Sequence, residues 1–264
     1  MFTKPNVRTK DYVVVFTVAR SVFLTEFKEK EMNRIAPLWI TLMFCGGIAL
    51  AQGNPELQQK AASAKEIAAH NQQALRAYTW ISKTELSYKG EVKSTLIESC
   101  VYGPDGEVQK TVVSAPAPAD KKRGVRGKVA KKKIGEMTEE LGAAAALAQS
   151  YVPPAADKLQ AVITAGNLSA SQAGPDMAAI RFGDYNKSGD SLSLVFDQQA
   201  YSLAQLNVDS WLKDEKDTVT IRVSFELLAD GTNYAASTVL NIPGSNIEVS
   251  ITNSNYQKVS PQDG

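Results

Sequence analysis

Residues 217–229 read DTVTIRVSFELLA, and apolar and polar side chains alternate along almost the whole stretch. The apolar set is Val219, Ile221, Val223, Phe225 and Leu227, and the polar set is Thr218, Thr220, Arg222, Ser224 and Glu226. Successive side chains of a strand point to opposite faces, so the pattern predicts a strand with one buried and one exposed face. Sheets of this kind are typically antiparallel.

The chain around this stretch continues the same pattern. Asp230-Gly231 is a strong hairpin signal, and it leads into predicted strands at 234–242 and 247–256. Three more strands are predicted upstream, at 177–182, 192–196 and 201–211. Short strands joined by tight turns predict an antiparallel meander in the C-terminal third of the chain.

A second group of strands is predicted closer to the N-terminus. Apolar residues recur at helical spacing over 55–78, after Pro55, and predict a helix there. The period then changes to two, which predicts strands at 78–88, 92–102 and 107–113, with a Gly-Pro-Asp-Gly turn before the last of them.

A helical insertion separates the two groups of strands. A proline-alanine linker precedes residues 121–133, KKRGVRGKVAKKK, and helices are predicted at 131–152 and 157–165. Neither group of strands is expected to form a stable sheet alone, although the length would allow two domains. We therefore predict one α+β domain over 52–264: a curved, half-open, barrel-like antiparallel sheet with an N-terminal helix and a helical insertion packed against it, and a basic loop at 114–133.

Residues 32–51 have the features of a signal peptide. Arg34 precedes an apolar run at 35–50, and Ala49-Leu50-Ala51 predicts cleavage between Ala51 and Gln52. The alternative is a membrane-spanning helix, but this needs about 20 apolar residues. Lipidation at Cys45 is not expected, because Phe44 stands where that processing needs a small residue. A periplasmic or secreted location follows.

Residues 1–31 show no cleavage pattern of their own. We expect Met32 to be the start of translation and 1–31 to be an over-extended reading frame; the alternative is an amphipathic leader. Cleavage after Ala51 leaves Cys100 as the one cysteine, and we expect it to be buried in a strand.

The basic segment, residues 121–133, is a local feature of an otherwise acidic chain. Residues 52–264 hold 22 basic and 24 acidic residues, or 14 and 24 without this segment. Nucleic-acid-binding domains are usually basic over a whole face, and no nucleic-acid partner is expected. We predict contact with an anionic membrane surface or an acidic partner, and the alternative is a solvated loop. The contact residues would be Lys121, Lys122, Arg123, Arg126, Lys128, Lys131, Lys132 and Lys133.

Three short motifs imitate catalytic or metal sites. Residues 189–192 spell GDSL, but the one histidine, His70, precedes the serine instead of following it near the end of the chain. Residues 184–189 imitate the start of a calcium loop, but Val195 stands where a bidentate Glu is needed. A zinc site would need more Cys and His than the mature chain holds. We predict a protein that is not an enzyme and has no cofactor or metal.

The layout resembles the outer-membrane lipoprotein carrier and receptor family. A signal peptide, an N-terminal helix, an antiparallel sheet and a mid-sheet helical insertion carry the resemblance, together with residues 78–89, YTWISKTELSYK, as a first strand. The resemblance implies an unclosed barrel whose helices cover an apolar cavity, in a family that ferries acylated proteins across the periplasm.

We therefore expect a periplasmic binding module that holds a lipid or an acylated protein by burying its acyl chain. The candidate cavity residues are Trp80, Tyr88, Phe196 and Trp211. The alternative is a scaffold protein of the cell envelope whose sheet only fills its own core.

Overall fold

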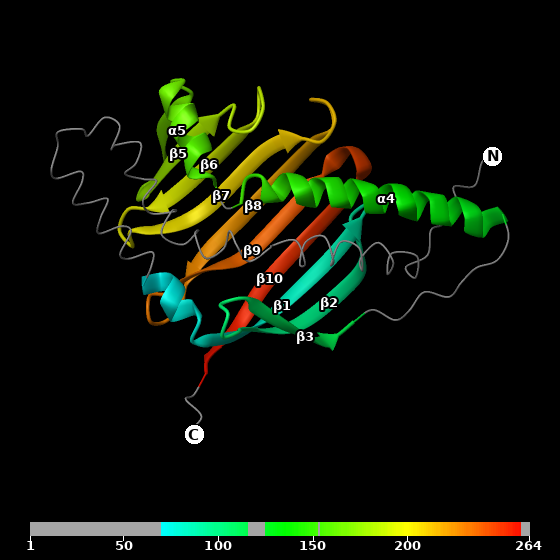
Figure 1. Ribbon diagram of the computed structural model, residues 1–264, viewed down its shortest axis with the longest axis horizontal. Helices are drawn as coiled ribbons and strands as arrows, with labels where there is room; N and C mark the ends of the chain where they lie inside the picture. The colour runs from blue at the N-terminus through cyan, green and yellow to red at the C-terminus, as the bar shows by residue number, and fades with distance from the viewer. Residues whose placement is uncertain (1–69, 116–124, 153, 260–264) are drawn as a thin grey trace.

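Ten strands form one antiparallel sheet, and two helices cover one of its faces (Figure 1). The computed structural model describes residues 70–115, 125–152 and 154–259. The α+β class with an open, curved antiparallel sheet is confirmed. Residues 70–75 are helical and end the helix predicted at 55–78, whose other residues, like the predicted signal peptide and residues 1–31, lie outside the described ranges.

Except between β3 and β4, the strands follow one another along the chain with short connections. They are β1 (Tyr78–Tyr88), β2 (Glu91–Tyr102), β3 (Val108–Ser114), β4 (Leu168–Gly174), β5 (Met177–Gly183), β6 (Ser191–Asp197), β7 (Ser202–Trp211), β8 (Thr218–Leu227), β9 (Asn233–Ile242) and β10 (Ile247–Lys258). The helices α4 (Val125–Gln149) and α5 (Ala156–Thr164) connect β3 to β4, and a 3-10 turn, η3 (Pro243–Ser245), precedes β10.

Nine of the strands match the predicted ranges to within two residues, and β4 was missed. The predicted loop at 114–133 is wrong in its second half, because α4 begins at Val125. Lys, Arg and Ala are good helix formers, so the basic segment can continue the helix despite Gly127, which costs about 1 kcal/mol.

The order of strands in the sheet is β3-β2-β1-β10-β9-β8-β7-β6-β5-β4. Every neighbouring pair follows the chain except β1 and β10, which run antiparallel from Tyr78 opposite Lys258 to Tyr88 opposite Ile247. The pairing of β1 with β10 therefore joins the N-terminal strands to the C-terminal meander. Among the described strands, β3 and β4 each have one partner, so the sheet is open at both edges.

The two edge strands dictate the course of the helical insertion. Since β3 and β4 lie nine strand spacings apart, the chain between them must cross about 43 Å of sheet. The 25 residues of α4 span about 37 Å at the rise of an α-helix. Helix α4 accordingly lies across the strands rather than along them (Figure 1).

The apolar core lies between this helix layer and the sheet. Helix α4 contributes Met137, Leu141, Ala144 and Ala148, and α5 contributes Leu159 and Val162. They pack with Leu86 and Leu96 from the N-terminal strands and with buried side chains of β5 to β10, among them Val219, Ile221 and Val223. The alternating stretch at 217–229 therefore buries the predicted face up to Val223, whereas Phe225 is partly buried and Leu227 is exposed.

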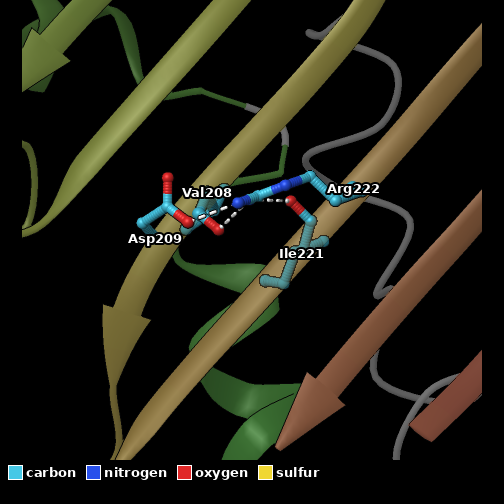
Figure 2. A network of polar contacts seen from close by, with 4 residues as sticks. All are labelled: Val208, Asp209, Ile221 and Arg222. Atoms are coloured by element: carbon cyan, nitrogen blue, oxygen red, sulfur yellow. Dashed lines mark hydrogen bonds and ion pairs between the residues drawn. The ribbon is translucent and has the colours of Figure 1, made fainter. Parts of the chain in front are cut away.

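The polar face of the same strand carries a cross-strand charge network (Figure 2). The Arg222 guanidinium donates to the carbonyl of Val208 at 2.6 Å and to that of Ile221 at 3.2 Å. It also forms an ion pair with Asp209. Both charged side chains are about half exposed, so the pair contributes at most about 1 kcal/mol to stability.

Candidate functional site

The four aromatic residues proposed as cavity lining lie in different surroundings. Phe196 belongs to the closed core beneath the helices, and Tyr88 packs against the rim of that core. Trp80 lies in a separate group of rings, and the Lys187 ammonium lies 4.5 Å from the ring of Trp211. No ring contact joins any two of the four within the part of the chain that the structure describes.

The group around Trp80 gathers aromatic rings from four strands. Trp80 stacks on Tyr256 at 5.6 Å between centroids with an interplanar angle of 5°, and its ring lies 5.3 Å from that of Tyr102. Tyr78 and Tyr234 contact Tyr256 at 6.2 and 4.4 Å. Burial raises the pKa of Tyr256. All four of these tyrosines were missed from the sequence, because nothing local indicates that β1, β2, β9 and β10 meet here.

A charged pair closes one side of this aromatic group. The Tyr78 hydroxyl donates to Asp230 at 2.6 Å, and the Lys258 ammonium lies 2.9 Å from the same carboxylate oxygen. The hydrogen bond from Tyr78 and the one from Lys258 hold the pKa of Asp230 well below its usual range. The group thereby fixes the β8–β9 turn to the start of β1 and the end of β10, which is a structural role.

Tyr88 lies where α4 meets the turn between β1 and β2. Lys89 and Gly90 form this turn, with φ of 56° and 76°, and two consecutive positive φ values are typical of a two-residue hairpin. The Lys89 ammonium lies 5.3 Å from the centroid of the Tyr88 ring. The Lys133 ammonium, from α4, lies at the same distance of 5.3 Å. Two cations from different elements therefore flank one phenol.

The electrostatics of Tyr88 reflect these cations. A hydrogen bond with Lys133 lowers the pKa of the phenol, and the charges of Lys133 and Lys89 add to this effect. Burial acts in the opposite direction but does not cancel it. The site around Tyr88 is consequently positive and favours anions.

Two further contacts hold the elements that carry these lysines. The Lys89 N–H donates to the Asn246 carbonyl at 2.8 Å, so the β1–β2 turn is fixed to the turn before β10. The Ser245 hydroxyl of η3 hydrogen-bonds to the Glu140 carboxylate of α4. Helix α4 and both turns therefore form one connected corner of the molecule.

Only part of the basic segment lies within the residues that the structure describes. Lys121, Lys122 and Arg123 lie outside them, and Arg126, Lys128 and Lys131 fall within the helical range of α4. Lys132 and Lys133 are exposed, and Lys132 forms an ion pair with Glu136 at 3.8 Å. The structure thus brings the end of the predicted surface-contact set next to Tyr88, one of the predicted cavity residues.

The GDSL motif has a structural explanation. Asp190 is buried and accepts hydrogen bonds from the Tyr151 hydroxyl and from the backbone N–H of Asn186 and Lys187. Ser191 is the first residue of β6, and it is also buried. The motif organises the turn between β5 and β6 and binds it to the segment between α4 and α5.

The calcium-like stretch, 184–189, is the same turn. Asp184 has φ of 51°, and its carboxylate accepts a hydrogen bond from the Gly189 N–H at 2.5 Å. Across the described ranges, no three Asp, Glu, His or Cys side chains gather as a metal site would require.

No helix in those same ranges is both long and apolar enough to cross a membrane.

Fold and site together define an α+β protein with an open antiparallel sheet, a crossing helix and a cationic corner at Tyr88. No protein-family model and no curated protein matches this sequence. Among solved structures, a DUF1329 family protein from Desulfovibrio piger is similar, with 9% sequence identity and a TM-score of 0.31. The similarity covers 75% of this chain and 92% of that chain. At that level of similarity neither a family nor a function follows for this chain.

Proposed function

We propose that the protein is a non-catalytic binding module of the bacterial cell envelope, which holds an apolar or acylated ligand and meets an anionic surface with its basic segment. The observation that carries the proposal is the division of α4 into two parts. Its first nine residues contain the end of the basic segment, whereas Met137 to Ala148 contribute four buried residues to the core. One helix thus joins a cationic region to the apolar interior.

The position of the basic residues supports a functional role for them. Arg126 and Lys128 fall at the start of α4, and the first turn contains no acidic residue. Cations at this end of a helix oppose the helix dipole, at a cost of about 0.3–1 kcal/mol each. A contribution to helix stability therefore does not explain why these basic residues are there.

Ligand binding would rest on burial without a chemical step. Each CH₂ group of an acyl chain removed from water contributes about 0.8 kcal/mol. Each Lys or Arg close to an anionic lipid surface adds about 1 kcal/mol, screened by salt. The resemblance in layout to the lipoprotein carrier and receptor family, and the signal peptide expected at 32–51, support a periplasmic place for this activity.

A scaffold protein of the cell envelope is the second candidate. The observation in its favour is Phe196, which was expected to line a cavity and is instead buried in a core shared by the sheet and both helices. A core filled in this way stabilises the fold without leaving room for an acyl chain at that point.

Mass spectrometry of protein secreted in a bacterial host tests the two candidates. Native and denaturing spectra of one periplasmic sample are compared for the full chain. We expect a mature mass that begins at Gln52, with an adduct of lipid mass that is lost on denaturation. A variant with all eight basic residues changed to Gln should still be cleaved before Gln52 and should lose part of the adduct.

The other outcomes are equally informative. A bare mature chain favours the scaffold, and an uncleaved chain contradicts the location on which both candidates depend.

A further inference from the structure

We infer that Lys89, Lys133 and Tyr88, here named the Tyr88 clamp, form a head-group site for the phosphate of an anionic phospholipid. This inference rests on the proposed function and names the ligand class and the residues that would recognise it. Lys89 was not among the residues expected from the sequence, because it lies 32 positions before the basic segment.

The first argument is convergence. Each ammonium lies 5.3 Å from the centroid of the same ring, so the two nitrogen atoms are separated by no more than twice that distance. One lysine comes from the β1–β2 turn and the other from α4. Lysine side chains are flexible, so both can turn toward one anion placed over the edge of the phenol.

The second argument is charge balance. Neighbouring lysines are already paired: Lys132 with Glu136 at 3.8 Å, and Lys93 with Glu91. Neither lysine of the clamp forms an ion pair with a carboxylate within the described residues. The clamp therefore holds two positive charges that an external anion can neutralise, and phosphate is a strong acceptor for ammonium groups.

The third argument is that the two elements that carry the lysines are held at one place. The Lys89 N–H is bound to the Asn246 carbonyl at 2.8 Å. On α4, Glu140 is hydrogen-bonded to Ser245, one residue before Asn246. The β1–β2 turn, which carries Lys89, and α4, which carries Lys133, are thus both bound to the turn before β10. Ligand binding therefore costs less conformational entropy.

The fourth argument selects a lipid rather than a wholly polar anion. The Tyr88 ring is partly buried and packs against the core cluster, while its two lysines are exposed. Cationic and apolar surfaces therefore meet at one residue. An anionic phospholipid presents the same two properties, a phosphate and an adjoining apolar chain.

Vesicle binding of the full-length secreted protein tests the inference. Binding to phosphatidylcholine vesicles is compared with binding to vesicles that also contain phosphatidylglycerol, for wild type, Lys89→Gln, Lys133→Gln and the double variant. We expect about fivefold weaker binding to the anionic vesicles for each single variant and about thirtyfold for the double variant. Binding to phosphatidylcholine alone should not change.

The matched control is the double variant Lys213→Gln/Lys216→Gln, which removes the same charge from two exposed lysines on the β7–β8 loop. It should bind the anionic vesicles like the wild type. If it weakens binding as much as the Lys89/Lys133 double variant does, net charge explains the effect and the inference fails. Circular dichroism of every variant checks that each is folded.

Three further outcomes separate the inference from the proposed function. A lipid adduct in the native mass spectrum, with clamp variants that bind like the wild type, overturns the inference and leaves the proposed function standing. No adduct and no vesicle binding overturns both. Equal competition by inorganic phosphate and by a soluble phosphatidylglycerol would show a phosphate site that does not recognise lipid, which also contradicts the inference.

Discussion

The Asp190 carboxylate joins three parts of the chain through hydrogen bonds. It accepts a hydrogen bond from the Tyr151 hydroxyl, between α4 and α5, and that hydroxyl also lies 2.8 Å from the Ser210 hydroxyl of β7. It accepts the Lys187 N–H at 3.0 Å from the turn before β6. Buried polar groups are costly unless they are paired, so this network specifies how the insertion meets the sheet.

Replacing the Tyr151 hydroxyl tests that role. Tyr151→Phe leaves a buried carboxylate and a buried hydroxyl without one of their partners. We expect the free energy of unfolding at pH 7 to fall by about 1–3 kcal/mol, measured by urea denaturation. Tyr201→Phe is the control, because Tyr201 is 81% exposed, and it should change stability very little.

The same variant should alter the response to alkaline pH. Burial, and then the hydrogen bond to Asp190, raise the pKa of Tyr151 above its ordinary value near 10. Below pH 10 the Tyr151 phenol is neutral in the folded and in the unfolded chain. As the pH rises above 10, the phenol ionises in the unfolded chain before it ionises in the folded chain. The Tyr151 contribution to stability is therefore complete below pH 10 and declines above it. The difference between wild type and Tyr151→Phe should shrink in that range, and a constant difference would contradict the assignment.

Helix α4 is the element on which both proposals depend. The side of the helix that packs on the sheet is apolar. Leu141 is fully buried in the core, one residue after Glu140, which is bound to η3. We expect this packing to contribute more to the stability of the helix than its sequence does, because most helical stability in proteins comes from the packing of an apolar face.

Shortening Leu141 tests the importance of that contact. Leu141→Ala creates a cavity between α4 and the sheet, and we expect it to lower the free energy of unfolding by about 2–5 kcal/mol in urea denaturation. Leu227→Ala removes the same atoms from a residue that is 45% exposed and should cost within about 0.5 kcal/mol. Similar losses in the free energy of unfolding for the two variants would show that Leu141 does not hold α4 on the sheet.

The described part of the molecule is a wide sheet whose two edge strands are largely exposed. Strand β4 is almost wholly exposed, as is most of β3, and each has a partner on one side among the described strands. The middle strands β8, β9 and β10 have partners on both sides and contribute Val223, Leu240 and Val249 to the core. Stability should therefore decrease from the centre of the sheet toward both edges.

Native-state hydrogen exchange measures this gradient directly. Amides of β8, β9 and β10 should exchange most slowly, close to the rate set by global unfolding, and those of β3 and β4 fastest, through local opening. Uniform protection across all ten strands would contradict the gradient and would indicate that the edges are covered.

The amino-acid sequence alone determined most of the elements and their faces. The alternation in 217–229 located a strand and its buried side, and Asp230-Gly231 located the following turn, because periodicity and turn chemistry are local properties of the chain. Strand β4, LSASQAG, has no such alternation, since both of its faces are exposed and its place depends on pairing with β5. The first turns of α4 were missed for a similar reason: a basic, glycine-containing segment suits a loop equally well until the helix is placed.

Only the tertiary structure decided which distant residues meet. The pairing of β1 with β10, the aromatic group on Tyr256 and the approach of Lys133 to Tyr88 all join segments that are far apart in the chain. The four aromatic residues chosen from the sequence were separated for the same reason. Contacts of this kind depend on how the whole chain packs its apolar surface into one core. No local pattern of residues predicts them.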